Sequence, residues 1–388
     1  MAACVRFLQC GGCRFGSPFW EGPERWITQR NQDLWQTFEA VLSLCRSEHI
    51  ELLFLTGDLF EQDYVDKQTV ERVARSLSKL KDTRIFITPG ERDPFVMTSA
   101  YRLAVWPSNV HIFSSGISSV RVPSLNVTVY GAGWTAYQQE LPVLEGFQAT
   151  RNGTIPIMVL HAEMESINNS EGFIPILPEH VASCGLAYLG LGHQAGWSGI
   201  HKVGATVWAD SGFLEARSSA ESGPHGVILG KIREDSVQVV FRELGQRHYI
   251  EKTYTVQDTI ENLSTKILFE TRLAERQRDL FRIRLSGSSL NVQAAVDPLK
   301  ILLADTFNFV DVVQTEDVTN SRIRADVVIP LDRTAGNWVG HHTLTQMFNN
   351  QLKERQENAL NTETQEHWKL VMKIGQAALG QGRIDDEN

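Results

Sequence analysis

The segment Leu53-Phe54-Leu55-Thr56-Gly57-Asp58 is a short apolar run that ends in a glycine and an aspartate. Short apolar runs bounded by turn residues are typical of buried strands. The glycine allows a sharp backbone turn, so the aspartate after it can project from the carboxyl end of the strand. Open α/β sheets bind ligands at this end of their strands, and the segment therefore predicts a site there. Taken alone, a Gly-Asp pair is more often an ordinary turn.

Three later apolar runs also end in polar side chains. Residues 84–88 lead into Gly90-Glu91-Arg92-Asp93, residues 155–160 end at His161, and residues 186–191 end at Gly192-His193. Carboxylates and imidazoles together are a donor set that suits manganese, iron or zinc. A single such histidine is more often a satisfied, partly buried side chain, but the four strand ends together predict one pocket. Its two carboxylates and two imidazoles would come from Asp58, the segment Gly90-Glu91-Arg92-Asp93, His161 and His193.

The order of apolar and amphipathic stretches predicts the fold class and the domains. Helical spacing at 31–46 and 66–81 alternates with strand-like runs, and closely spaced strands from residue 110 suggest antiparallel members. We expect an α/β fold, a β-sandwich flanked by helices. The pattern restarts near residue 246, where helices at 257–274 and 292–303 alternate with strands at 280–285 and 310–314. The predicted domains are 1–245, an α+β unit at 246–330 and a helical tail at 331–388.

Composition excludes several classes of protein. Hydrophobic residues at 42% and charged residues at 21% are typical of a soluble globular chain, not a disordered or fibrous one. No apolar run approaches the roughly 18 residues of a membrane span, and the N-terminus lacks a signal-peptide layout, so we expect a cytoplasmic protein without membrane contact. A net charge of −9 means that any nucleic-acid contact needs a local basic patch.

In order and spacing the motifs resemble those of the calcineurin-like metallophosphoesterases, and among them the SbcD family and its YhaO-type relatives. The family pattern runs Asp-x-His, Gly-Asp, Gly-Asn-His-Asp, a lone His and Gly-His-x-His, and the resemblance covers residues 6 to about 242. It implies a four-layer β-sandwich with a two-metal site and a DNA double-strand-break nuclease subunit. It also implies that the α+β unit is a capping domain and that the tail docks on an SbcC-type SMC ATPase.

The chain departs from this pattern at five positions. Gly12 stands where the family has the aspartate of its first motif, and Arg14 where it has the histidine. Glu91 replaces the ligand asparagine, and Arg92 replaces the histidine that helps to protonate the leaving group. Ala195 replaces the final histidine. By the resemblance, the first metal ion retains one ligand, Asp58, whereas the second retains Asp58, His161 and His193, with Glu91 as an added oxygen donor.

The replacement of these ligands predicts weak hydrolysis of phosphoesters. Two-metal phosphoester hydrolysis uses one ion to generate hydroxide and both ions to clamp the attacking and leaving oxygens. Arg14 and Arg92 bring positive charge into the pocket and suit phosphate binding, since a guanidinium binds phosphate in a bidentate fork. Neither can act as a general acid or base near neutral pH. The pocket is thus better suited to holding a phosphate than to cleaving one.

Two other features have ordinary interpretations. Cys10 and Cys13 form a Cys-x-x-Cys pair without the second pair of a zinc site, so we interpret them as small residues in an emptied motif. Trp20, Trp26 and Trp35 could stack on bases, although packing is the more common use of such residues.

Three functions remain open from the sequence. The first is an SbcD-like subunit with impaired catalysis, which binds a DNA end or another phosphate and docks on an SbcC-type ATPase. The second is an active phosphodiesterase with one manganese or other divalent metal ion at Asp58, Glu91, His161 and His193. The third is a structural assembly subunit with no metal. The sequence leaves open whether the chain forms a homodimer.

Overall fold

The computed structural model describes residues 4–137, 143–150, 152–164, 175–257, 259–287 and 289–315. All of them belong to one compact unit, Met1–Thr315. The predicted helical tail at 331–388 and the end of the predicted α+β domain lie outside the described residues. No helix in the described ranges is long and apolar enough to cross a membrane.

The first six-stranded sheet contains the apolar strand that precedes Gly57 and Asp58, and its order is β14-β13-β1-β2-β3-β4. The central strands β1 to β4 pair in parallel, whereas β13 and β14 form an antiparallel hairpin at one edge. The strands are β1 (Val5–Cys10), β2 (Leu52–Leu55), β3 (Arg84–Ile87), β4 (Val110–Ile112), β13 (Gly226–Ile232) and β14 (Val237–Glu243).

The second six-stranded sheet has the order β11-β12-β10-β7-β6-β5. The inner strands are parallel, and β5 and β11 are antiparallel edges. The prediction of antiparallel members after residue 110 is confirmed for β5 and β6, whereas β4 joins the first sheet in parallel. The strands are β5 (Ser118–Val122), β6 (Val127–Ala132), β7 (Ile155–His161), β10 (Tyr188–Gly192), β11 (His201–Val203) and β12 (Thr206–Asp210).

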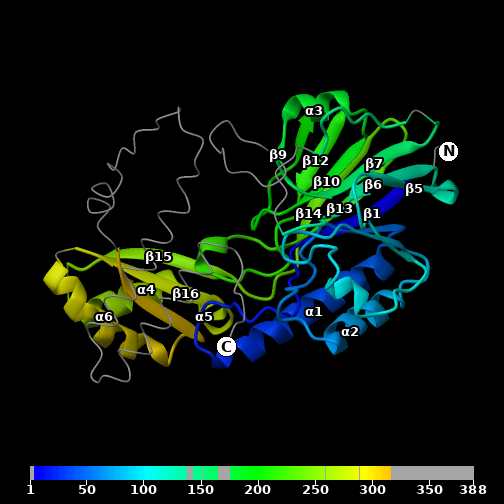
Figure 1. The fold of residues 1–388 in the computed structure, drawn as a ribbon. Coiled ribbons are helices and arrows are strands. Elements are labelled where there is room, and N and C mark those ends of the chain that lie inside the picture. Colours follow the sequence, from blue (N-terminus) through cyan, green and yellow to red (C-terminus); the bar gives the residue numbers. More distant parts are fainter. Residues whose placement is uncertain are drawn as a thin grey trace, which may run out of the picture. The chain divides into compact units, whose positions relative to one another are not determined.

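The two sheets pack face to face, with helices on their outer faces (Figure 1). In β2, Leu52 and Phe54 belong to the core between the sheets, whereas Leu53 and Leu55 pack under helices α1 (Arg25–Ser47) and α2 (Lys67–Leu77). Helix α3 (Pro178–Ser183) packs on the second sheet. Strands buried on both faces are apolar throughout, which explains the unbroken apolar runs. The predicted fold class, a mixed α/β β-sandwich flanked by helices, is confirmed.

Helix α1 begins at Arg25, six residues before the predicted start at 31. The cause is a buried arginine, because Arg30 is fully buried and forms ion pairs with Asp33 at 2.7 Å and with Glu215 at 3.1 Å. Arginine is usually exposed, so the apolar spacing of the sequence did not indicate that the turn around Arg30 is helical and faces the interior.

A third sheet lies C-terminal to the sandwich and has the order β15-β16-β17, all parallel. Its elements are β15 (Tyr249–Thr255), α4 (Ile260–Glu270), α5 (Leu273–Arg278), β16 (Leu280–Ser286), α6 (Ser289–Ala304) and β17 (Phe309–Gln314). The single helix predicted at 257–274 was wrong, because the chain is extended at Thr271 and Arg272 and a second helix follows. The predicted domain boundaries stay predictions.

The remaining elements are short. Strands β8 (Glu163–Met164) and β9 (Pro175–Ile176) form a two-stranded parallel sheet, which the sequence did not indicate. Three single-turn helices complete the described chain: η1 (Ala100–Arg102), η2 (Pro123–Leu125) and η3 (Ser219–Glu221).

Candidate functional site

The predicted strand ends meet at one edge of the sandwich, with glycines where they approach most closely. Asp58 follows β2, and His161 ends β7 of the opposite sheet. A Cβ on Gly57 would lie 2.1 Å from His161 Nδ1, and one on Gly90 would lie 2.4 Å from Asp58 Oδ1. A side chain at either position would force these groups apart, so glycine is required for the close approach.

The backbone is held in an unfavourable conformation at this edge. Arg14, Asp58 and His193 have positive φ angles of 49°, 52° and 132°. They are three of the five described non-glycine residues with positive φ. Side chains disfavour this region, and such strain tends to gather at functional sites, where the surrounding structure maintains it.

Asp58 and His161 form the most buried donor pair. His161 Nδ1 lies 3.0 Å from the carbonyl oxygen of Thr56, which can only accept, so Nδ1 carries the proton. His161 Nε2 therefore presents its lone pair. It is buried without a hydrogen-bond partner and lies 3.6 Å from Asp58 Oδ1. Two acceptors that face each other in a buried space require a proton or a cation between them.

The electrostatics of the pair agree with this geometry. Burial raises the pKa of Asp58 to about 6, the backbone N–H of Arg92 lowers it, and the negative charge of Glu91 raises it. That N–H donates to Asp58 Oδ1 at 3.0 Å. Burial lowers the pKa of His161. The pair thus consists of a neutral imidazole and a carboxyl group that resists ionisation. A cation bound between them would supply positive charge and favour the ionised form of the carboxyl group.

His193 forms a second pair with a residue that the sequence did not indicate. His193 Nε2 lies 3.6 Å from Glu163 Oε2, and both side chains are partly buried. The rings of His161 and His193 are perpendicular, with their centroids 5.3 Å apart. Burial, followed by the nearby His161, lowers the pKa of His193. Both histidines are thus kept neutral, the form that binds metal ions.

Glu91 and Arg92 lie at the outer side of the site. The Arg92 Nε donates to Glu91 Oε1 at 3.1 Å, and the Arg92 side chain is 49% exposed. The guanidinium can therefore reach a ligand that approaches from solvent. The negative charge of Glu91 raises the pKa values of Asp58, His161 and His193. One of its carboxylate oxygens, however, already accepts from Arg92.

The positions of the first motif are occupied by other groups. The Arg14 Nε and Nη2 donate to Glu61 Oε2 at 2.8 and 2.6 Å, in an ion pair that is largely buried. A Cβ on Gly12 would lie 2.1 Å from the ring of Phe213. At the position of the family's final histidine, the carbonyl of Ala195 accepts from the backbone N–H of Phe213 at 2.9 Å. The structure thus places Arg14 at the site, with two of its donors already bound.

Asp93 binds the loops together, a role that the sequence did not predict. Its carboxylate accepts five hydrogen bonds, from the N–H groups of Asp58, Leu59, Phe60 and Gly90 and from the hydroxyl of Tyr101. It therefore fixes the loop after β2 against the loop after β3. Burial nevertheless raises its pKa to about 6.

Only pairs of donors, and no larger set among the described residues, have the spacing of ligands on one metal ion. Two ligands bound at the usual distances to one ion lie roughly 3.0–3.7 Å apart, which includes the 3.6 Å between Asp58 Oδ1 and His161 Nε2. As the side chains stand, however, the described part of the chain contains no group of three or more His, Cys, Asp or Glu residues that could hold an ion. The orphaned, buried His161 Nε2 is the strongest indication that a cation belongs there.

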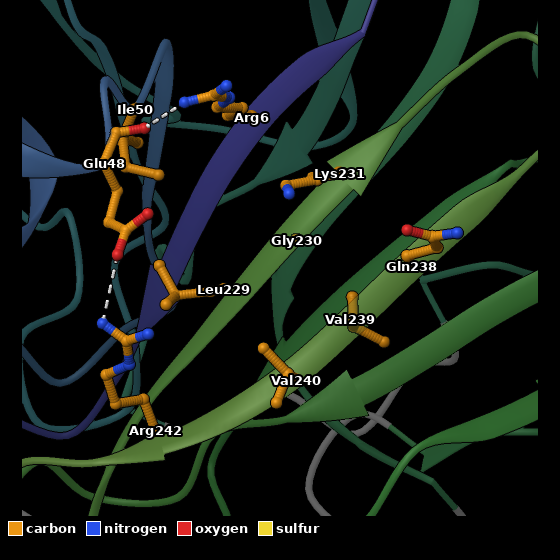
Figure 2. A pocket seen from close by; sticks show the side chains of 10 residues that line it. All are labelled: Arg6, Glu48, Ile50, Leu229, Gly230, Lys231, Gln238, Val239, Val240 and Arg242. Atoms are coloured by element: carbon orange, nitrogen blue, oxygen red, sulfur yellow. Dashed lines mark hydrogen bonds and ion pairs between the residues drawn. The ribbon is translucent and has the colours of Figure 1, made fainter.

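A separate pocket of about 280 Å³ lies on the outer face of β1, β13 and β14 and includes none of these residues (Figure 2). Glu48 holds two of the basic residues that line it, through an ion pair with Arg242 at 3.3 Å and a hydrogen bond from Arg6 to its carbonyl at 3.0 Å. We place the chemistry at the strand ends, where the buried donors lie, and not in this pocket.

The other residues that the sequence singled out have structural roles. Trp20 and Trp26 are buried, the guanidinium of Arg217 lies over the Trp20 ring, and Trp35 packs on Phe15. Their interpretation as packing residues is confirmed. Cys10 and Cys13 are buried and free.

No protein-family model matches the chain. It is 20% identical over 258 residues to the uncharacterised metallophosphoesterase YhaO of Bacillus subtilis (strain 168). The match covers 62% of this chain and 61% of YhaO, which is less than two thirds of that protein. This similarity supports the metallophosphoesterase superfamily that the motifs indicated.

Several solved structures resemble the described fold. The protein TT1561 of Thermus thermophilus is 13% identical, with a TM-score of 0.40, over 62% of this chain and 99% of that one. A dimetal phosphatase from Danio rerio is 10% identical, with a TM-score of 0.39, over 62% of this chain and 96% of its own. A purple acid phosphatase from yellow lupin seeds is 8% identical, with a TM-score of 0.40, over 63% of this chain and 53% of its own. Similarities this low carry no functional argument.

Proposed function

We propose that this chain is an SbcD-like subunit of a DNA-processing complex, and that its metallophosphoesterase-type site binds the phosphate of a DNA end but cleaves it poorly. One contrast within the site carries the proposal. Buried donors remain at Asp58 and His161, whereas Phe213 and the Arg14–Glu61 ion pair fill the space that the first motif would need.

In this proposal Asp58, His161 and His193 hold one divalent metal ion, manganese or a related one. When bound, the ion would polarise a phosphate oxygen. Arg92 would bind the phosphate from the solvent side, where its guanidinium is exposed. Arg14 would contribute positive charge, although Glu61 takes two of its donors.

The partner part of the proposal rests on the sequence. Residues 341–379 contain two apolar stripes at helical spacing, which suit docking on an SbcC-type SMC-like ATPase. These residues lie outside the described chain. We place the complex in the cytoplasm, where a protein with five free cysteines stays reduced.

The phosphate claim is tested by fluorescence anisotropy with a blunt DNA duplex, with and without a 5′-phosphate, in the absence of metal. Replacing Arg92 by Ala should weaken binding of the phosphorylated duplex by about tenfold, since a charge-assisted hydrogen bond contributes about 1.5 kcal/mol or more. Arg272→Ala is the matched control, because its side chain is 86% exposed and lies in the α+β part. A wild-type chain that binds both duplexes equally would refute the claim.

The second candidate is a one-metal phosphodiesterase, which the unpartnered His161 Nε2 favours. The third, a structural assembly subunit, requires no ion. Metal content separates them: about one transition-metal ion per purified chain keeps the enzyme possible, and none favours assembly.

A further inference from the structure

We propose that three aromatic side chains beside the phosphate site, Phe19, Tyr64 and Tyr137, stack on unpaired bases at a DNA end. The inference rests on the proposed function and narrows its ligand to a DNA end with a single-stranded overhang. The three side chains are 51%, 54% and 50% exposed, and none stands at a position of the family's motif pattern. Bases inside a duplex are stacked on each other, so such rings can reach only unpaired ones.

The three rings lie on loops that leave their strands at the edge where the site forms. Strands β1 and β2 are parallel, and Phe19 and Tyr64 follow them along the chain. Tyr137 follows β6, which is parallel to β7 and whose last residue lies opposite Leu160, the residue before His161. Since the carboxyl ends of parallel strands meet at one edge of a sheet, the rings belong to the same edge as the phosphate site.

Backbone hydrogen bonds hold the loops after β1 and β2 side by side. The N–H of Phe15 donates to the carbonyl of Leu59 at 2.9 Å, and the N–H of Glu61 donates to the carbonyl of Phe15 at 2.9 Å. Phe19 and Tyr64 follow on these two segments, and their rings form an edge-to-face pair with centroids 5.1 Å apart. In such a pair the edge of one ring contacts the face of the other, so one ring keeps both faces outside this contact.

Two hydrogen bonds connect Tyr137 to the residue that we expect to bind the phosphate. Gln62 Nε2 donates to Tyr137 Oη at 2.6 Å, and the backbone N–H of Gln62 donates to the carbonyl of Arg92 at 3.1 Å. A single residue thus joins a half-exposed ring to an arginine whose side chain is 49% exposed. An aromatic face next to a cation is the combination with which proteins bind single strands.

The charges near Tyr64 favour contact with bases over contact with further phosphates. Asp63 is exposed between Gln62 and Tyr64, where it would repel a phosphate. Stacking on a ring requires no charge and contributes about 5- to 150-fold in affinity per base. The rings would therefore bind the bases, while Arg92 binds the phosphate.

The test is fluorescence anisotropy of the full chain, without metal, on three 5′-phosphorylated duplexes. One is blunt, one has a 5′ overhang of about four thymidines, and one has an overhang of the same length without bases. The thymidine overhang should bind at least about fivefold more tightly than the other two, because only it offers bases for stacking. Equal binding of the two overhangs would overturn the inference.

Substitutions of the rings assign the effect to this surface. Tyr64→Ala and Tyr137→Ala should each weaken binding of the thymidine overhang by about fivefold or more. Tyr137→Phe keeps the ring and loses only the hydroxyl that contacts Gln62, so it should retain most of the affinity. Phe269→Ala is the matched control, because its side chain is 91% exposed on α4, in the α+β part. Wild-type affinity in both alanine variants would refute the stacking role.

The same assay separates this inference from the proposed function. If the wild type binds all three duplexes equally and Arg92→Ala weakens each of them, the phosphate proposal stands and the stacking inference fails. If the thymidine overhang binds equally well with and without its 5′-phosphate, and still better than the overhang without bases, the stacking inference stands and the phosphate proposal fails.

Discussion

The ring of Phe213 fills the space into which a side chain at position 12 would project. A Cβ at Gly12 would lie 2.1 Å from Phe213 Cδ1, and Gly12 itself has a φ of +57°. Only glycine adopts this φ at little cost. The aspartate of the family's first motif could therefore return only if the aromatic ring moved away.

Gly12→Asp should lower the free energy of unfolding by about 2–4 kcal/mol, because it combines overpacking with backbone strain. The double variant Gly12→Asp, Phe213→Ala should recover part of this loss, since the two positions share one space. Urea denaturation of the single and double variants measures both effects. A Gly12→Asp chain as stable as the wild type would show that the ring is easily displaced.

The ion pair between Arg14 and Glu61 predicts opposite effects on stability and binding. Their side chains are 12% and 7% exposed, and they approach to 2.6 Å. Glu61→Gln leaves a largely buried guanidinium without its counter-charge, which should cost about 2–4 kcal/mol of stability. It also releases the Arg14 donors, so the affinity for inorganic phosphate should rise severalfold.

Calorimetry with inorganic phosphate and urea denaturation together test the Glu61→Gln prediction. Glu71→Gln is the matched control, because its ion pair with Lys67 lies on the surface of α2 at 3.8 Å and contributes little. A Glu61→Gln chain that loses stability without binding phosphate more tightly would mean that Arg14 has no access to the ligand.

Nuclease activity should be absent or very weak. With Gly12 and Ala195 at ligand positions of the first ion, most of the two-metal stabilisation of the transition state is missing. Incubation of the pure chain with blunt duplex DNA and Mn²⁺ should release few nucleotides. Robust cleavage that is lost in the Asp58→Ala variant would instead establish the one-metal enzyme.

A histidine near the start of β15 predicts a pH dependence of stability. Hydrogen bonding to Asp279, and then to Glu243, raises the pKa of His248, although burial lowers it. His248 Nδ1 lies 3.5 Å from Asp279 Oδ1 and 3.3 Å from Arg278 Nη2, while its Nε2 contacts Glu243. A raised pKa means that the folded state binds the proton more tightly than the unfolded state.

The stabilisation from His248 is therefore complete below the unfolded pKa of about 6.5 and is lost as pH rises through the folded value. His248→Gln should flatten this part of the stability profile by about 1 kcal/mol or less, because the pair is partly exposed. Thermal unfolding between pH 5.5 and about 8.5 measures the slope. His201→Gln, on edge strand β11, is the control and should keep the wild-type slope.

The sequence predicted those parts of the fold that are buried by apolar side chains alone. Strands such as β2 and β7 lie between two layers, so they are apolar throughout and end abruptly at polar residues. The first turns of α1 escaped prediction because the buried Arg30 is paired with Glu215, which is 185 residues away in the chain. A local pattern contains no information about such a partner.

In the site, too, the sequence predicted the residues that directly follow strands and missed the others. Asp58, His161 and His193 follow strands directly, and the order of strand ends places them together. Glu163 was missed because its partner, His193, follows the neighbouring strand β10, 30 residues away in the chain, and Glu163 belongs to no motif. The same holds for the Glu61 that binds Arg14, which is 47 residues away.

The last prediction concerns residues 331–388. The α+β part has a core of its own around residues such as Ile283 and Leu299. If the tail serves a partner and not the core, the chain shortened after Pro330 should stay folded, with an unfolding midpoint within a few degrees of that of the full chain. If the apolar stripes of 341–379 serve an SbcC-type ATPase, the shortened chain should fail to co-purify with it, while phosphorylated duplex still binds through Arg92. A control that replaces Trp368 and Val371 by Ser in the full chain should lose the partner in the same way. Aggregation or unfolding of the shortened chain would instead mean that these stripes cover its core, and the docking proposal would fail.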